Sequence, residues 1–202
     1  MRIAVFGATG RTGRPLVEQA IERGDEVVAL SRSPEPALPA SIEVVRGDAR
    51  DLEAVRSVVD GADAVASVLA IEAGTEPTTM LSDATRTIVD AMVAEDVRRI
   101  VITTNSTVFT DREIRDPFRI VAEEHRRNVA MLRGTTLDWT VLAPTLLHDG
   151  DPGELEAVID ARASAKEISR VGLATAVLDA IGRDAWIGHV VGVADGPGST
   201  EG

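Results

Sequence analysis

Residues 1–32, MRIAVFGATGRTGRPLVEQAIERGDEVVALSR, decide the fold of this 202-residue chain. They begin with the apolar run Ile3–Phe6 and continue through the glycine-rich segment Gly7–Gly13. A stretch with helical periodicity then leads to a second apolar run, which ends at Leu30. This order predicts a strand, a tight turn, a helix and a second, parallel strand. Such a crossover is the unit from which doubly wound α/β folds are built.

The glycines of the turn each have a separate physical task. Gly7 lets the chain turn sharply away from the strand, because glycine adopts backbone conformations that other residues avoid. Gly10 has no side chain, so a pyrophosphate can approach the backbone, and Gly13 lets the helix pack closely on the strand. The positive end of that helix then faces the phosphates. We therefore expect a dinucleotide site, the alternative being a loop of the same shape without a nucleotide. The expected contacts from this turn are Gly7, Thr9, Gly10, Arg11, Thr12 and Gly13.

Strands and helices alternate along the rest of the chain. The pattern predicts strands over residues 26–30, 42–46, 64–69, 99–104, 137–142 and 189–193, and helices over residues 12–23, 51–60, 77–95, 117–133, 154–163 and 171–181. This alternation is typical of a doubly wound, mostly parallel α/β sheet, the Rossmann fold. We expect a single domain over residues 1–202, with residues from about 145 to 202 forming a small cap on the substrate side. The Gly/Pro/Ser-rich end of the chain is expected to be loose.

Composition and charge exclude several classes of function. The formal net charge of −12 opposes non-specific binding to nucleic acid or anionic lipid. No apolar run reaches membrane-spanning length, and no signal-peptide pattern opens the sequence. The chain has no Cys and no histidine pair at metal-ligand spacing, so neither disulfides nor a metal site are expected. We expect a cytoplasmic monomer or homodimer that acts on a small molecule, without nucleic-acid or membrane partners.

The end of the second predicted strand indicates which dinucleotide binds. An acidic residue there would accept hydrogen bonds from both adenosine ribose hydroxyls and favour NAD. The chain instead has Ser31 and Arg32, and a guanidinium binds a 2′-phosphate through two parallel hydrogen bonds. We therefore expect both residues to contact the cofactor, and NADP(H) to be preferred over NAD(H). The alternative for Arg32 is a solvated loop arginine.

Two further residues are candidates for the adenosine end. Arg11, inside the glycine turn, is a possible second cation for the 2′-phosphate. Asp48 follows the third predicted strand, where its carboxylate can accept a hydrogen bond from the adenine amino group. The alternative is that Asp48 only forms the turn beside Gly47.

The ends of the fourth, fifth and sixth predicted strands should face the nicotinamide, because ligands bind at the carboxyl ends of such strands. Polar residues directly after an apolar strand can bind the nicotinamide ribose, the carboxamide or a substrate carbonyl. Alternatively, they cap the next segment. The candidate cofactor contacts at this end are Leu69, Ala70, Thr104, Asn105, Pro144, Thr145 and Leu146.

Catalytic residues are harder to assign. Common short-chain dehydrogenases protonate the carbonyl with a Tyr assisted by a Lys on the same helix, but this chain has no Tyr and its single lysine is Lys166. The candidates are Ser106 and His148, whose imidazole can donate a proton near neutral pH and lies beside Asp149. The alternatives are a serine that satisfies local backbone and a surface histidine. His125 either orients the Ser106 loop or, as we favour, lies on a helix surface.

The chain resembles the atypical short-chain dehydrogenase/reductase proteins with an NAD(P)-binding, NmrA-like fold, and within them the flavin reductase/biliverdin-IXβ reductase type. The resemblance rests on residues 4–13, 30–32, 47–48, 124–125, 137–140, 143–144, 168–170 and 173–174. It implies NADPH binding through the glycine turn and Arg32, with the nicotinamide near residues 104–106 and 144–146. In the flavin-reductase relatives a serine follows strand five and a histidine follows the proline after strand six. Here those positions fall at Asn105 and Leu146.

Two functions from different classes remain open at this point. The first is an NADPH-dependent oxidoreductase that reduces a planar, electron-poor acceptor such as a flavin or quinone. In it the cofactor supplies the hydride and water can supply the proton. The second is a non-catalytic, redox-sensing regulatory protein that binds NADP(H), which the absent tyrosine and the displaced serine and histidine favour. Of the two we expect the reductase, of the atypical type without a Tyr/Lys pair. A sugar-nucleotide epimerase or dehydratase is disfavoured, because those enzymes need the tyrosine.

Overall fold

The computed structural model describes residues 1–74 and 76–196 of the chain. Its strands are β1 (Arg2–Phe6), β2 (Glu26–Ser31), β3 (Glu43–Arg46), β4 (Ala64–Ser67), β5 (Arg99–Thr103), β6 (Asp138–Pro144), β7 (Leu146–His148), β8 (Glu154–Ile159), β9 (Glu167–Ser169) and β10 (His189–Gly196). Its helices are α1 (Gly13–Glu22), α2 (Leu52–Val59), α3 (Met80–Ala94), α4 (Arg119–Arg133) and α5 (Arg170–Ile181), with short 3₁₀ helices η1 (Ser106–Phe109) and η2 (Asp184–Trp186).

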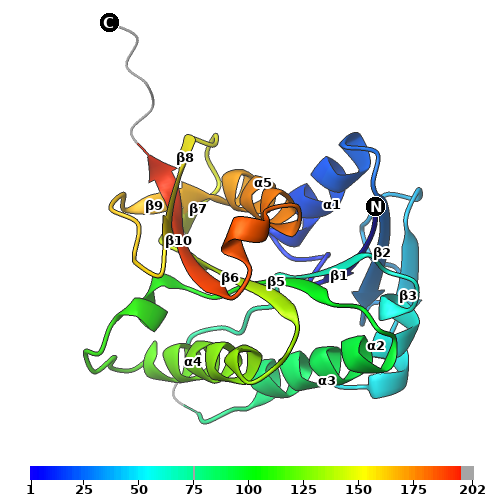
Figure 1. Cartoon of the computed structure of the whole chain (residues 1–202), viewed down its shortest axis with the longest axis horizontal. Coiled ribbons are helices and arrows are strands. Elements are labelled where there is room, and N and C mark those ends of the chain that lie inside the picture. The colour runs from blue at the N-terminus through cyan, green and yellow to red at the C-terminus, as the bar shows by residue number, and fades with distance from the viewer. Residues whose placement is uncertain (75, 197–202) are drawn as a thin grey trace, which may run out of the picture.

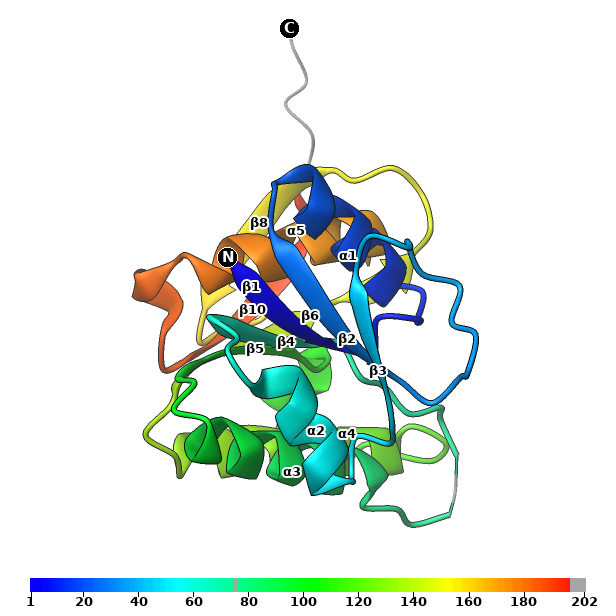
Figure 2. The same cartoon turned by 90° about the vertical axis from the view of Figure 1, so that its right-hand side faces the viewer.

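One large sheet forms the centre of the described part of the chain. Its eight strands follow the order β3-β2-β1-β4-β5-β6-β10-β8, and every neighbouring pair is parallel except β10 and β8. Helices α1 and α5 cover one face, and α2, α3 and α4 cover the other (Figure 1), as the view from the side also shows (Figure 2). The predicted doubly wound, mostly parallel α/β fold is therefore confirmed. Within residues 1–74 and 76–196, no helix is both long and apolar enough to cross a lipid bilayer.

The first strand illustrates how the sheet is buried on both faces. Ile3 and Val5 point into the apolar layer under α1 and α5, whereas Ala4 and Phe6 point into the layer shared with α2, α3 and α4. All four side chains are buried, and such a continuous apolar run is typical of a central parallel strand. Because β1 pairs with β2 on one side and β4 on the other, the glycine turn after Phe6 lies at the middle of the sheet's carboxyl edge.

The segment Glu154–Ile159 is a strand, so the helix predicted over residues 154–163 is wrong. This strand pairs antiparallel with β10 and forms one edge of the sheet. Leu155 packs on the apolar layer under α1 and α5, whereas Ala157 and Ile159 are exposed. Pairing with β10 therefore overrides the helix-forming composition of this segment.

Residues 145–196 do more than cover the ends of the strands. Strands β10 and β8 extend the main sheet, and α5 packs beside α1, where Arg23 and Asp179 form an ion pair at 2.7 Å. The expectation that residues from about 145 to 202 form a cap is therefore wrong for β8, β10 and α5. The small parallel pair β7–β9 forms a separate sheet. The tail predicted to be loose, residues 197–202, lies outside the described residues.

Candidate dinucleotide site

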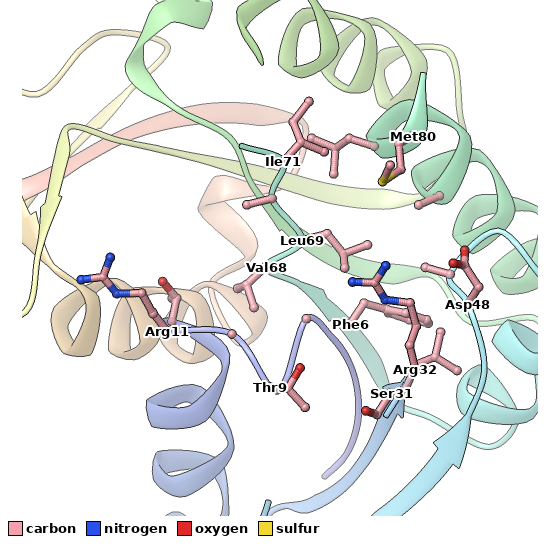
Figure 3. Close-up of a pocket in the computed structure, with 18 of the residues that line it drawn as sticks. Phe6, Thr9, Arg11, Ser31, Arg32, Asp48, Val68, Leu69, Ile71 and Met80 are labelled. Atoms are coloured by element: carbon pink, nitrogen blue, oxygen red, sulfur yellow. The ribbon is translucent and has the colours of Figure 1, made fainter. Parts of the chain in front are cut away.

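A cavity of about 530 Å³ opens where β1, β2 and β4 end, and its volume is typical of a small-molecule site. Figure 3 shows how side chains from the glycine turn, the end of β2 and the segment after β4 converge on it. Ten of the residues predicted to contact the cofactor line this cavity: Gly7, Thr9, Gly10, Arg11, Thr12, Ser31, Arg32, Asp48, Leu69 and Ala70. The structure thus brings together residues from Gly7 to Ala70, which lie 63 positions apart in sequence.

The glycine turn has the geometry that its sequence predicts. Gly7 has a φ of 89°, which favours glycine, and a Cβ there would lie 2.9 Å from the carbonyl of Val68. The amide of Gly10 donates to the carbonyl of Gly7 at 3.0 Å, which closes the turn. Gly13 does not line the cavity; a Cβ there would overlap the Gly7 carbonyl oxygen and lie 2.7 Å from Ala8 Cα. Helix α1 therefore packs on the turn at backbone distance, and its N-cap residue Thr12 lines the cavity.

The end of β2 presents an arginine to the cavity. Arg32 is exposed and reaches into the cavity (Figure 3). Within residues 1–74 and 76–196, its guanidinium makes no hydrogen bond or ion pair. Ser31 is buried, and its hydroxyl accepts from the Ser33 amide at 3.2 Å. The donors of Arg32 are therefore free to bind an anionic ligand.

Asp48 is bound by Arg50, a residue that the sequence interpretation missed. The carboxylate accepts from the Arg50 amide and guanidinium at 2.8–3.1 Å, and these contacts lower the pKa of Asp48 to about 2. The Asp48 carbonyl also accepts from the Asp51 amide at 3.0 Å. Asp48 thus forms the turn beside Gly47, which was one of the two predicted alternatives. It also lines the cavity together with Arg50. The sequence signal for this contact is the run Gly47–Arg50, in which the acid is followed two positions later by an arginine. The sequence interpretation used the acid alone.

Arg11 lies on the opposite side of the glycine turn from Arg32 (Figure 3). Its guanidinium pairs with Asp149, whose carboxylate also accepts from Arg170 at 2.7 Å. Both arginines lower the pKa of Asp149, chiefly through the hydrogen bond from Arg11. Arg11 and Arg170 both line the cavity. Arg11 is therefore directed away from Arg32, and its role as a second cation for the 2′-phosphate stays a prediction.

Of the residues predicted for the nicotinamide end, Leu69 and Ala70 line the cavity, whereas the five at the ends of β5 and β6 do not. Thr104 is buried and its hydroxyl donates to the Leu142 carbonyl at 3.3 Å. Asn105 caps η1, accepting from the Thr107 amide at 3.0 Å, as the structural alternative predicted. Thr145 is buried, and its Oγ1 has no partner within the described residues. Pro144 is buried at the end of β6, whereas Leu146 is 72% exposed.

The two candidate catalytic residues are not brought to the cavity. Ser106 is the first residue of η1 and is half-buried. His148 accepts from the Gly150 amide through Nδ1 at 3.0 Å, so in its neutral form Nε2 carries the proton and donates it to Asp195 at 3.1 Å. Both nitrogens of His148 are thus used within the protein. The same Asp195 carboxylate accepts from the Ser169 amide at 2.8 Å, which ties the β7–β9 pair to β10.

Glu124 on α4 sets the position of one cavity wall. Its carboxylate is completely buried and accepts from the amides of Leu81 and Ser82 at 2.8 and 2.9 Å, and from the Ser82 hydroxyl at 2.8 Å. Burial raises the pKa of Glu124, but hydrogen bonds from Ser82 and Arg127 outweigh it and the net shift is downward. Because Met80 and Leu81 line the cavity, this carboxylate caps the first turn of α3 and holds the wall in place.

His125 is 5% exposed, so the interpretation that it lies on a helix surface is wrong. Its face of α4 is packed inside the molecule together with Glu124 and Asn128. Its Nδ1 has no hydrogen-bond partner within the described residues. Burial lowers the pKa of His125 to about 4, against a small opposing effect of Glu124. The imidazole is therefore neutral at physiological pH.

The burial of His125 predicts a pH-dependent stability. The unfolded chain takes up a proton near pH 6.5, whereas the folded chain resists it until about pH 4. The unfolded state binds more protons in between, so the free energy of unfolding should fall by about 2 kcal/mol from pH 7 to pH 5. Urea unfolding at both pH values checks this, with His125→Leu as the variant that should lose this component. Equal losses in both proteins, or an NMR titration of His125 near pH 6.5, would contradict it.

No three carboxylate or imidazole side chains in residues 1–74 and 76–196 are arranged to hold a metal ion. The groups that converge on the cavity are instead arginines, backbone amides and apolar side chains. Arginines and helix N-terminal amides bind phosphates, and the strand order places the cavity where doubly wound sheets bind dinucleotides. The fold and the cavity together define a Rossmann-type α/β protein with a candidate dinucleotide site.

Comparison with known proteins assigns the family. The family described as NAD(P)H-binding matches residues 7–184, and the chain belongs to this family. An uncharacterized protein of Mycobacterium tuberculosis (strain ATCC 25618 / H37Rv) is 35% identical over 105 residues, which cover 52% of this chain and 12% of that protein. The chain therefore spans only a small part of this curated relative.

Solved structures of similar fold cover nearly the whole chain. A proposed NADH-flavin reductase from Streptococcus pneumoniae TIGR4 has a TM-score of 0.81 and 20% identity, covering 97% of this chain and 100% of that one. A short-chain dehydrogenase/reductase from Veillonella parvula DSM 2008, crystallised with NADP, has a TM-score of 0.77 and 19% identity, covering 98% and 95% of the two chains. At these identities the likeness is one of fold.

Proposed function

We propose that this protein is an NADPH-dependent reductase of a planar, electron-poor acceptor such as a flavin or a quinone. The observation that carries the proposal is Arg32 at the end of β2, which makes no hydrogen bond or ion pair with the described residues and lies in a cavity that also holds the glycine turn. Membership of the NAD(P)H-binding family supports the coenzyme class. The structural neighbour crystallised with NADP shows that a similar fold accepts this coenzyme.

The residues of the cavity fit a phosphorylated dinucleotide. The turn and the N-terminus of α1 would hold the pyrophosphate, and Arg32 with Ser31 would hold the adenosine ribose. Outside the cavity lining, Thr145, whose buried Oγ1 has no partner among the described residues, would hold the nicotinamide end. A buried hydroxyl without a partner is unfavourable, so this oxygen fits a site where a ligand supplies the donor.

The chain's own residues position the reactants and limit water. When bound, the nicotinamide supplies the hydride. Leu69, Ile71 and Leu147 give the cavity apolar walls, which suit a flat aromatic acceptor. With no Tyr in the sequence, the chain offers no phenol to protonate a carbonyl. A conjugated ring that takes its proton from water needs none, and this favours flavins or quinones over simple ketones.

Exchanging Arg32 for methionine should weaken NADP⁺ binding by roughly ten- to a hundredfold, because a charged hydrogen-bond partner of the 2′-phosphate is lost. The affinity for NAD⁺ should stay unchanged. Titration calorimetry with both coenzymes measures the two affinities. Arg86→Met is the matched control, because Arg86 is exposed on α3 and does not line the cavity. A wild-type protein that prefers NAD⁺ would refute the selectivity.

Turnover is tested by steady-state NADPH oxidation with FMN, FAD, riboflavin and simple quinones. We expect oxidation with at least one of these acceptors, at a rate that depends on both NADPH and acceptor. A protein that binds NADP(H) and oxidises it with none of them is not this reductase.

One observation favours the alternative of a non-catalytic NADP(H)-binding regulator. Ser106 and His148 lie outside the cavity, and both nitrogens of His148 are used within the protein. In that case NADPH and NADP⁺ should bind without turnover, and the two redox states should change the association of the protein with a partner. Association that is the same with and without coenzyme would exclude this alternative.

A further inference from the structure

The clearest unassigned feature of the cavity is a second arginine at its adenosine end. Building on the proposed function, we infer that Arg50 binds the 2′-phosphate of NADP(H) together with Arg32, and that Asp48 holds Arg50 in place for this task. Asp48 is then a positioning residue for an arginine, and not the partner of the adenine amino group.

Asp48 fixes the Arg50 side chain through three hydrogen bonds. Its Oδ1 accepts from the Arg50 amide at 2.9 Å and from Nε at 2.8 Å, and its Oδ2 accepts from Nη2 at 3.1 Å. The paired contact on Nε and Nη2 holds the guanidinium plane in one orientation. Nη1 makes no hydrogen bond with the described residues. The outer edge of this guanidinium is therefore oriented and still has donors for a ligand.

The two arginines face the same carboxylate from the same end of the cavity. Arg32 and Arg50 both line the cavity, and both act electrostatically on Asp48; Figure 3 shows Asp48 beside the tip of Arg32. The other carboxylate that faces Arg50 is Asp83 on α3, and this group accepts from the Thr79 hydroxyl at 2.7 Å. A phosphate monoester carries nearly two negative charges at neutral pH, which one guanidinium does not neutralise. Arg50 shares its charge with Asp48, so what it adds to Arg32 is the oriented donors on the outer edge of its guanidinium.

The remaining arginines of the cavity are placed elsewhere. Arg11 extends away from Arg32 on the other side of the glycine turn (Figure 3) and, like Arg170, pairs with Asp149. Among the described residues that line the cavity, Arg50 is thus the arginine positioned to assist Arg32. It fills the role that the sequence interpretation had given to Arg11.

Titration calorimetry of the full chain with NADP⁺ and with NAD⁺ tests this assignment. Arg50→Met should weaken NADP⁺ binding roughly tenfold, because one charged partner of the phosphate is removed, and should leave NAD⁺ binding unchanged. Arg50→Lys should give an intermediate loss, because lysine keeps the charge without the paired contact to Asp48. Arg86→Met is again the control and should bind both coenzymes as the wild type does. Thermal unfolding of each variant verifies the fold.

The outcomes separate this inference from the proposed function. If Arg50→Met binds NADP⁺ as tightly as the wild type, or loses NADP⁺ and NAD⁺ equally, the role of Arg50 is overturned while the proposed function stands. If the wild type binds neither coenzyme, the proposed function fails and the inference fails with it. If Arg50→Met does not fold, the ratio of NADP⁺ to NAD⁺ affinity in Arg50→Lys decides, and an unchanged ratio overturns the inference.

Discussion

Replacing Glu124 with alanine should lower the free energy of unfolding by about 3–5 kcal/mol, the usual cost of removing one partner from a buried ionic contact. The carboxylate is completely buried and takes hydrogen bonds from the Leu81 and Ser82 amides. Arg127 also donates to it, at 2.7 Å from Nε. Its removal leaves the Leu81 and Ser82 amides without this acceptor in a place that water does not reach.

Urea unfolding at pH 7 measures the effect, and Glu123→Ala is the matched control. Glu123 is the preceding residue of α4, and its side chain is 39% exposed in an ion pair with Arg119, so its loss should leave the stability nearly unchanged. The Glu124 variant should also bind NADP⁺ more weakly than the control, because the α3 residues Met80 and Leu81 form a wall of the cavity. Equal unfolding midpoints for the two variants would show that the capping contact does not stabilise the fold.

Gly13→Ala should destabilise the protein by about 3 kcal/mol or more, at the upper end of the cost of overpacking. A Cβ at this position meets backbone atoms, the Gly7 carbonyl oxygen and Ala8 Cα. These backbone atoms cannot move aside, whereas the end of a flexible side chain can change its conformation. The whole of α1 would therefore have to move off β1, which would also pull its N-terminal amides away from the pyrophosphate position.

Gly182→Ala is the matched control for this substitution. Gly182 follows α5, its φ is −90°, and a Cβ there would meet no atom within 4 Å. This variant should unfold at nearly the same urea concentration as the wild type. If Gly13→Ala unfolds together with this control, close packing of helix on strand is not what position 13 provides.

The elements that were predictable from sequence are those specified by local signals. The turn at Gly7 and the arginine after β2 each follow from neighbouring residues, and the structure places both in one cavity. The strand at Glu154–Ile159 was missed because its pairing partner β10 lies thirty or more residues further along. Likewise, nothing near His148 in sequence shows that Asp195 accepts a hydrogen bond from its Nε2. Arg50 was not predicted, because the sequence interpretation of this turn rested on the acid two positions before it.

The carboxylate of Asp149 has a consequence for how ionic strength acts on this protein. It joins Arg11 and Arg170 at the glycine-turn end of the cavity, so a diphosphate must share these two cations with an anion that the chain itself provides. Added salt weakens the attraction between the dinucleotide and the arginines. It also weakens the ion pairs of Asp149 with Arg11 and Arg170, which compete with the dinucleotide for the same two cations. Coenzyme affinity should therefore decline less steeply with salt than four arginines around one cavity would suggest.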